Sequence, residues 1–275
     1  MAVGARRCAR AVIEYEGTAF AGSQYQPNAR TVQGELERAL NRLTGERVRV
    51  RFAGRTDAGV HATGQVAAFC LPSPPPGGDG VGWRELQRRL NAVLPPDLAV
   101  RALRSAPPGF EPRRDALARA YRYRIRMNGA RVPVDRHRTL EIDESLDVGA
   151  MRLAAAQLLG ERDFGAFGSD VHGRTVRELR EVRITRRGDL VEIRVVANAF
   201  LRRMVRSIVA VLLQVGRGRL DAQAVAGFLG AGRRALHGQA APARGLVLER
   251  VIYSNQQGGV AGHGARHRPS QKAEQ

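Results

Sequence analysis

The sequence predicts an α+β protein, and two observations lead to this expectation. The apolar patterns of the first half follow the order strand, helix, strand, strand, helix, strand, and the second half repeats this order less cleanly. With 275 residues, of which 43% are hydrophobic, the chain is long enough to bury a sizeable core. We therefore expect two ferredoxin-like (βαββαβ) units whose mainly antiparallel sheets join across a central cleft.

The first half shows the elements most clearly. Its first helix is expected to lie between Thr31, as the N-terminal cap, and Gly45, as the stop, because a hydroxyl accepts from first-turn amides and glycine adopts the left-handed conformation. A second helix is expected over residues 83–94. The expected strands are residues 10–16, 47–53, 64–70 and 97–103.

The second half opens with a strand over residues 118–127, followed by a helix that Ser145 is expected to cap and that stops before Gly160. A hairpin is expected around residues 187–189. Two helices, at about 200–215 and 221–229, and a strand within 244–254 complete this half. The domains expected are residues 1–105, residues 106–253 and a disordered tail over 254–275, which has no hydrophobic periodicity.

The charge balance points to a polyanionic partner. The chain has 45 Lys and Arg against 26 Asp and Glu, a net charge of +19. Basic side chains that meet phosphates release condensed counterions and so gain affinity for nucleic acid. An alternative is a codon habit, since Lys272 is the only lysine, although arginine also suits the task because it stacks on bases and forks onto phosphate.

Other classes of protein are disfavoured. The chain has no apolar run of about 18 residues and no secretory signal, so we expect a cytoplasmic protein without a membrane span. Cys8 and Cys70 are too few for a disulfide framework, and no Cys/His grouping has zinc-ligand spacing.

The segment "GRTDAGVH", residues 54–61, is the first candidate for chemistry. It places Asp57 between glycines, and Gly54 and Gly59 would permit tight backbone geometry and the close approach of a ligand. An ordinary turn is the alternative, because Asp and Gly are common turn residues. A hairpin needs far fewer than eight residues, which favours a functional loop.

Two further segments carry candidate residues. In "RAYRYRI", Tyr121 and Tyr123 share one face of a strand, where they serve either a site or the core. In the helix after residue 200, Arg202 and Arg206 flank an apolar stripe one turn apart, and a solvated position is the default for either.

Together these segments resemble the TruA family of tRNA pseudouridine synthases. The resemblance runs in the family's order from about residue 10 to residue 253, and one departure is visible: Ser23 stands where the family usually has Trp. The matching segments are "YEGTAFAGSQYQ", "TVQGELERAL", "FAGRTDAGVHATGQVAAF", "LNAVLPPDLAV", "RAYRYRI", "DFGAF", "NAFLRRMVRSIV" and "GLVLERVIY".

The resemblance implies an isomerase that converts uridine to pseudouridine at positions 38, 39 and 40 of the tRNA anticodon stem-loop. It implies that Asp57 is the nucleophile, which attacks either the sugar or the base, or abstracts a sugar proton. Arg206 would hold Asp57 ionised, Tyr121 would stack on the flipped uracil, and Arg55 would fill the space that the uracil vacates. His61 is expected to be structural rather than the partner of Asp57.

The resemblance also implies no metal or other cofactor, and a homodimer in which one tRNA contacts both subunits. Two rival functions remain. A non-enzymatic RNA-binding protein with duplicated ferredoxin-like units would need aromatic side chains exposed on its sheet, yet only 5% of residues are aromatic. A metal-dependent nuclease would need several carboxylates, and "GRTDAGVH" supplies one.

Overall fold

A computed structural model describes residues 7–72, 81–129, 131–169, 173–230 and 234–254. The helices are α1 (Val32–Thr44), α2 (Val81–Val93), α3 (Val148–Ala156) and α4 (Met204–Gly216). The strands are β1 (Arg7–Tyr15), β2 (Arg51–Phe52), β3 (His61–Leu71), β4 (Leu98–Ser105), β5 (Ala118–Arg126), β6 (Leu140–Glu141), β7 (Gly160–Asp163), β8 (Val176–Arg187), β9 (Leu190–Ala197) and β10 (Leu246–Ile252).

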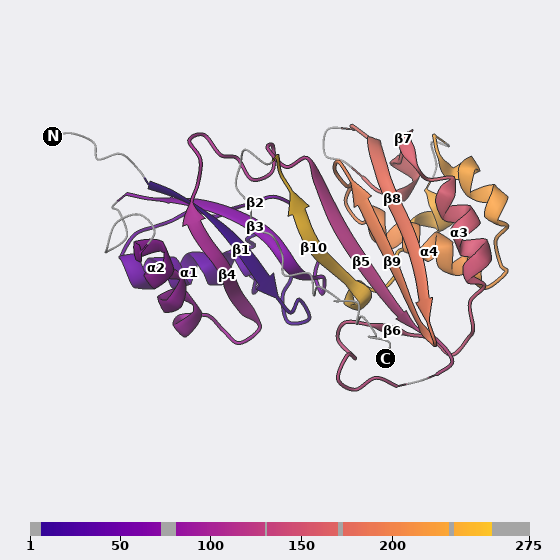
Figure 1. Cartoon of the computed structure of the whole chain (residues 1–275), viewed down its shortest axis with the longest axis horizontal. Helices are drawn as coiled ribbons and strands as arrows, with labels where there is room; N and C mark the ends of the chain where they lie inside the picture. The colour runs from indigo at the N-terminus through magenta and orange to yellow at the C-terminus, as the bar shows by residue number, and fades with distance from the viewer. Residues whose placement is uncertain (1–6, 73–80, 130, 170–172, 231–233, 255–275) are drawn as a thin grey trace, which may run out of the picture.

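The strands of this part of the chain form a single sheet in the order β4-β1-β3-β10-β5-β9-β8-β7, with β2 beside β3 and β6 beside β5. Figure 1 shows α1 and α2 next to the N-terminal strands and α3 and α4 next to the C-terminal strands. The pairing is mostly antiparallel, as expected, and the exceptions are β10 with β3 and β5 with β6. The expectation of an α+β fold is therefore confirmed.

Strand β10 joins the two halves, because it lies between β3 and β5 although it follows every other described strand in the chain. Val247 pairs with His61 across this junction. At Gly64 the backbones approach so closely that an added Cβ would stand 2.1 Å from the carbonyl oxygen of Glu249, so only glycine fits there.

The elements of the first half largely match the predictions. Thr31 caps α1 by accepting the amide of Gly34, and Gly45 ends it with φ 72°. The strand expected at 47–53 is wrong over its first part, since β2 comprises only Arg51–Phe52. Side chains of α1 take the backbone groups of Val50 instead: Glu37 accepts its N–H at 2.9 Å and Gln33 donates to its carbonyl at 3.1 Å.

The second half needs three corrections. Helix α3 is capped by Asp147, whose carboxylate accepts the amide of Ala150 at 2.9 Å, and not by Ser145. Helix α4 begins at Met204 instead of residue 200, because Arg203 is left-handed with φ 64°. The helix expected at 221–229 is a 3₁₀ helix over Ala222–Phe228. The hairpin between β8 and β9 is confirmed, and the expected tail lies outside the described residues but for 254.

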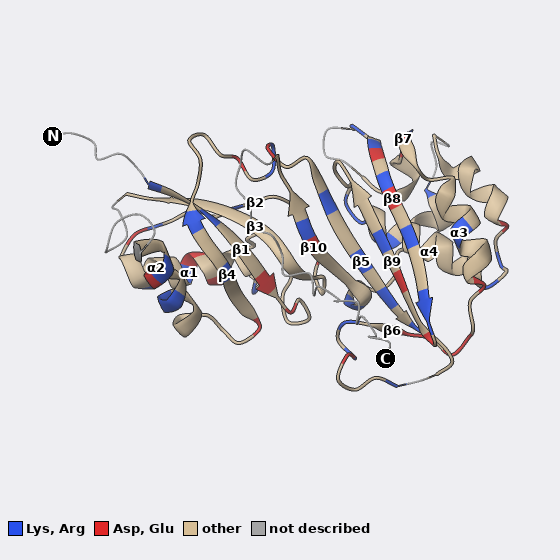
Figure 2. Cartoon of the chain, viewed as in Figure 1, with Lys and Arg blue, Asp and Glu red and all other residues tan. Residues whose placement is uncertain are grey.

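The core is continuous from one half to the other. On β5, Tyr121 and Tyr123 are buried, while Arg122 and Arg124 alternate with them and pair with Glu192 at 3.1 and 3.3 Å. Figure 2 shows basic and acidic residues along β5, β8 and β9. One face of this part of the sheet thus packs the core and the other carries charge.

Cys8 and Cys70 face each other across β1 and β3 and form a disulfide, so the two cysteines pair although they are too few for a framework. Within the described ranges, the helices are all too short or too polar to cross a membrane.

Candidate active site

Asp57 lies in the loop between β2 and β3, with 27% of its side chain exposed. Its carboxylate accepts a hydrogen bond from Arg206 Nη1 at 3.2 Å, although the two residues are 149 positions apart. Arg206 belongs to the first turns of α4, and its Nε donates to the carbonyl of Ala241 at 2.7 Å. The bond from Nε therefore fixes the guanidinium, and Nη1 is left to donate to Asp57.

The residue before Asp57 is held from three directions. Ser23 Oγ accepts the N–H of Thr56 at 2.9 Å, and the N–H of Ser23 donates to the carbonyl of Thr56 at 3.1 Å. The hydroxyls of Thr56 and Tyr15 lie 2.8 Å apart in a hydrogen bond. Ser23, Thr56 and Tyr15 are all buried, so water does not compete for these bonds.

Glycines shape this loop, but not all those expected to. Gly59 is left-handed with φ 76°, a conformation that suits glycine, whereas Gly54 has open space around it and no left-handed φ. Gly17 and Gly22 lie outside the motif and matter more. An added Cβ on Gly17 would stand 2.1 Å from the carbonyl oxygen of Val60, and one on Gly22 would stand 2.9 Å from that of Thr56.

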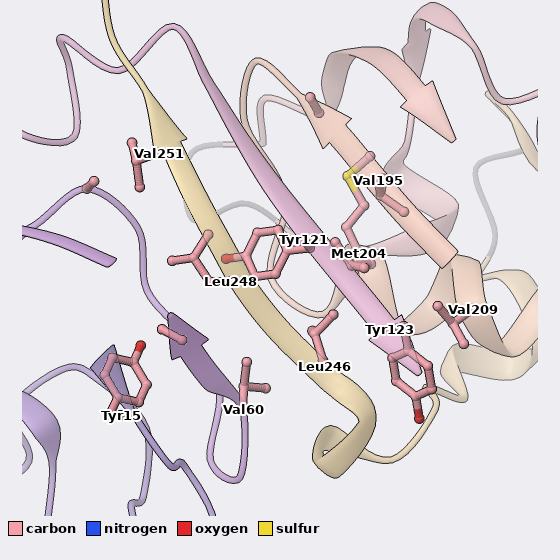
Figure 3. Close-up of a cluster of buried hydrophobic side chains, with 14 of the residues drawn as sticks. Tyr15, Val60, Tyr121, Tyr123, Val195, Met204, Val209, Leu246, Leu248 and Val251 are labelled. Atoms are coloured by element: carbon pink, nitrogen blue, oxygen red, sulfur yellow. The ribbon is translucent and has the colours of Figure 1, made fainter. Parts of the chain in front are cut away.

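Tyr121 reaches this loop from β5. Figure 3 shows its ring directed from β5 over β10, beside Leu248, toward the N-terminal half, where Tyr15 lies. Burial raises the pKa of the Tyr121 phenol well above its ordinary value, and the charge of Asp57 is a smaller contribution in the same direction.

A small cavity lies where these groups meet. Its volume is about 40 Å³, which is room for a few water molecules. Phe200 meets Tyr121 edge-on with ring centroids 5.1 Å apart. The lining residues are Thr56, Asp57, Val60, Tyr121, Phe200, Leu201, Arg203, Met204, Val205, Arg206 and Leu246.

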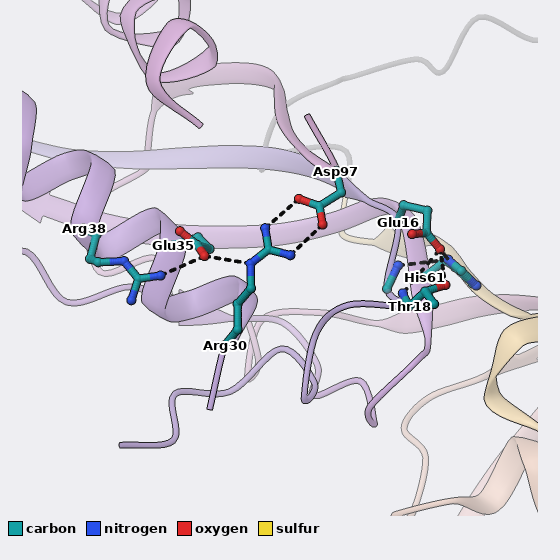
Figure 4. A network of polar contacts seen from close by, with 8 residues as sticks. Glu16, Thr18, Arg30, Glu35, Arg38, His61 and Asp97 are labelled. Carbon is teal, nitrogen blue, oxygen red and sulfur yellow. Dashed lines mark hydrogen bonds and ion pairs between the residues drawn. The ribbon is translucent and has the colours of Figure 1, made fainter. Parts of the chain in front are cut away.

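Arg55 and His61 lie apart from the Asp57 carboxylate. Arg55 is exposed and makes no hydrogen bond or ion pair with another described residue. His61 is 1% exposed, and burial lowers its pKa. Its Nδ1 accepts the N–H of Gly17 at 2.9 Å, and its Nε2 lies 3.2 Å from the carbonyl oxygen of Arg244, so Nε2 carries the proton. Figure 4 shows Glu16 beside the same ring.

Sequence reasoning missed Arg119, which is only 7% exposed. Its guanidinium donates to the carbonyls of Ala53, Arg113, Ala116 and Asn198 at 2.6–3.2 Å. Ala53 opens the Asp57 loop and Asn198 directly follows β9, so one side chain ties the loop to the other half. The available signal was its position two residues before Tyr121, which places both side chains on the same face of a strand.

Among the described residues, no group of three or more His, Cys, Asp and Glu side chains is placed to hold a metal ion. The charged residues that line the cavity are Asp57, Arg203 and Arg206.

Known proteins resemble this chain along most of its length. The family model described as tRNA pseudouridine synthase matches residues 11–108 and 154–254. Relatives named tRNA pseudouridine synthase A include one from Geotalea daltonii, 40% identical over 88% of this chain and 98% of its own length. The one from Myxococcus xanthus is 44% identical over 88% and 90%. The one from Geobacter sulfurreducens is 41% identical over 90% and 100%.

Proposed function

The chain belongs to the tRNA pseudouridine synthase family, and on this premise we propose that Asp57 is the nucleophile of its reaction. The protein isomerises uridine to pseudouridine in tRNA. The finer proposal is that the target uridines occupy positions 38, 39 and 40 of the anticodon stem-loop.

One observation carries the assignment of Asp57: its ion pair with Arg206 at the wall of the cavity beside Tyr121. A neighbouring cation favours the ionised carboxylate that nucleophilic attack needs. In the reaction the C1′–N1 bond breaks, the uracil turns and a C1′–C5 bond forms. N1 gains a proton and C5 loses one, so there is no net redox change or hydrolysis, and Asp57 is regenerated.

The target base must leave the stem to reach Asp57, because a stacked base cannot enter a cavity. The cavity beside Asp57 is where the flipped uracil would enter, since Tyr121 and Phe200 line it together with Asp57 and Arg206. Tyr121, which Phe200 meets edge-on, would stack on the uracil there. We assign Arg55, whose guanidinium is exposed next to this loop, to the space that the base vacates.

We also propose that each half is a ferredoxin-like unit, residues 1–105 and 106–253. If the two-residue β2 is counted and β6 and β7 are left out, the strands of each unit follow the order 4-1-3-2, as β4-β1-β3-β2 and as β10-β5-β9-β8. A cytoplasmic homodimer that offers one tRNA a doubled basic surface would suit a chain with a net charge of +19.

The test is to incubate the protein with an unmodified tRNA transcript in EDTA and to map pseudouridine chemically. We expect product at positions 38–40 from the wild type and none from Asp57→Asn or Asp57→Ala, with tRNA affinity kept within about tenfold. Activity of Asp57→Ala would exclude the nucleophile assignment.

The same assay tests the rival RNA-binding module, which would make no product. The described strands also lack what that rival needs, since Tyr15, Tyr121 and Tyr123 are all buried.

A further inference from the structure

Tyr25 lies on the loop that holds the Asp57 loop, and it is unusual in its exposure. It is 48% exposed, and every other large hydrophobic residue exposed in the described ranges is aliphatic. Its ring lies over the first turn of α1, where a Cβ added to Gly34 would stand 3.8 Å from Tyr25 Cδ2 and 4.0 Å from Arg38 Nη1. The guanidinium of Arg49 lies 5.9 Å from the ring centroid. We call Tyr25, Arg38 and Arg49 the Tyr25 surface.

This surface presents cations to solvent although each arginine has an acidic partner. Arg38 and Arg49 are 67% and 78% exposed, whereas their partners Glu35 and Glu37 are 16% and 14% exposed. A ligand that approaches from solvent therefore meets two guanidinium groups around one aromatic ring, while the carboxylates lie behind them.

The Tyr25 surface is fixed relative to the catalytic loop. The N–H of Tyr25 donates to Gln33 Oε1 at 2.9 Å, and the carbonyl of Ser23 accepts the N–H of Gln33. Ser23 in turn binds both backbone groups of Thr56, the neighbour of Asp57. The backbone of Tyr25 is thus connected to the Asp57 loop through hydrogen bonds of 2.9–3.1 Å.

We propose that the Tyr25 surface stacks an unpaired base of the tRNA and binds the adjoining phosphates, apart from the pocket for the target uracil. An exposed aromatic ring flanked by arginines provides both interactions, because every base has a π-face and guanidinium forks onto phosphate. This site rests on the proposed function only in that the ligand is tRNA, and it does not depend on the role of Asp57.

The first experiment measures the affinity for a tRNA transcript and the kinetics of pseudouridine formation in the full-length protein. Tyr25→Ala should weaken binding by about 5- to 150-fold and leave kcat at saturating tRNA unchanged, whereas Tyr25→Phe should bind like wild type. Leu117→Ala, which removes a side chain that is 50% exposed, is the matched control. Binding by Tyr25→Ala within twofold of wild type, or a loss in kcat alone, would overturn the proposal.

A second experiment observes stacking directly. The chain has one tryptophan, Trp83, which is 1% exposed, so Tyr25→Trp adds the only exposed indole of the described residues. Adding the transcript should quench this new fluorescence in proportion to the tRNA bound. Saturating binding without quenching would overturn the proposal. If Asp57→Ala proved active while the Tyr25 variants behaved as expected, only the nucleophile assignment would fail.

Discussion

Replacing Gly17 with alanine should displace the Asp57 loop. The added Cβ would stand 2.1 Å from the carbonyl oxygen and 2.5 Å from the carbonyl carbon of Val60. Both are backbone atoms, so no side chain can turn away to make room. Ordinary contact needs about 3.5 Å, and the two segments must therefore separate by more than about 1 Å.

That separation strains two contacts, one of which holds Asp57, the proposed nucleophile. The N–H of Val60 donates to the carbonyl of Asp57 at 3.2 Å, and the N–H of Gly17 donates to His61 at 2.9 Å. A misplacement of about 1 Å at a reacting group can cost about a hundredfold in rate, and overpacking of this kind costs about 1–3 kcal/mol of stability. We expect Gly17→Ala to lose about a hundredfold in kcat and about 1–3 kcal/mol in the free energy of unfolding.

Single-turnover pseudouridine formation and urea denaturation measure the two effects. Gly227→Ala is the control, because an added Cβ there meets nothing within 4 Å and the backbone is not left-handed. It should keep full activity and gain up to about 1 kcal/mol of stability. A kcat for Gly17→Ala within threefold of wild type would refute the inference that this contact positions the loop.

Three further changes test the groups around the loop. Ser23→Ala leaves the buried N–H of Thr56 without an acceptor, so it should cost about 1–3 kcal/mol of unfolding free energy in urea denaturation and about tenfold in kcat. The control is Thr31→Ala, which removes a similar buried bond at the start of α1 and should lower stability without changing kcat. Arg119→Met removes the donor shared by several carbonyls and should cost at least about 3 kcal/mol, with Arg119→Lys recovering part of it. Burial lowers the pKa of His61 in the folded state. The neutral ring therefore contributes its full stability above about pH 6.5, and this stability falls at lower pH by up to about 1.4 kcal/mol per pH unit. Urea midpoints measured from about pH 5 to 8 should show this slope, and His61→Gln should flatten it.

Local patterns predicted the elements that local contacts stabilise. Thr31 and Gly45 bound α1 as expected, because a cap depends on residues within one turn. The start of the strand at 47–53 failed because side chains from α1 take the backbone groups of Val50, and alternation along one strand carries no information about such a partner.

The site divides in the same way. The motif around Asp57 pointed to a functional loop, but its pairing with Arg206 came from the family resemblance, since no spacing rule connects residues 149 apart. Alternation placed Tyr121 opposite Arg122, but it could not show that Arg119, on the face of Tyr121, is buried with its own acceptors. Ser23 was noticed only as a departure from the family, and its bonds to Thr56 come from the structure.

The place of β10 in the sheet has a consequence for biosynthesis. A ribosome that has synthesised the first 245 residues has already made Asp57, Tyr121 and Arg206, but not the strand that lies between β3 and β5. Until Leu246–Ile252 emerges from the exit tunnel, the nascent chain lacks the strand that pairs with both β3 and β5, and the cavity wall lacks Leu246. Nascent chains stalled before this segment should therefore carry every proposed catalytic group and still leave tRNA unmodified.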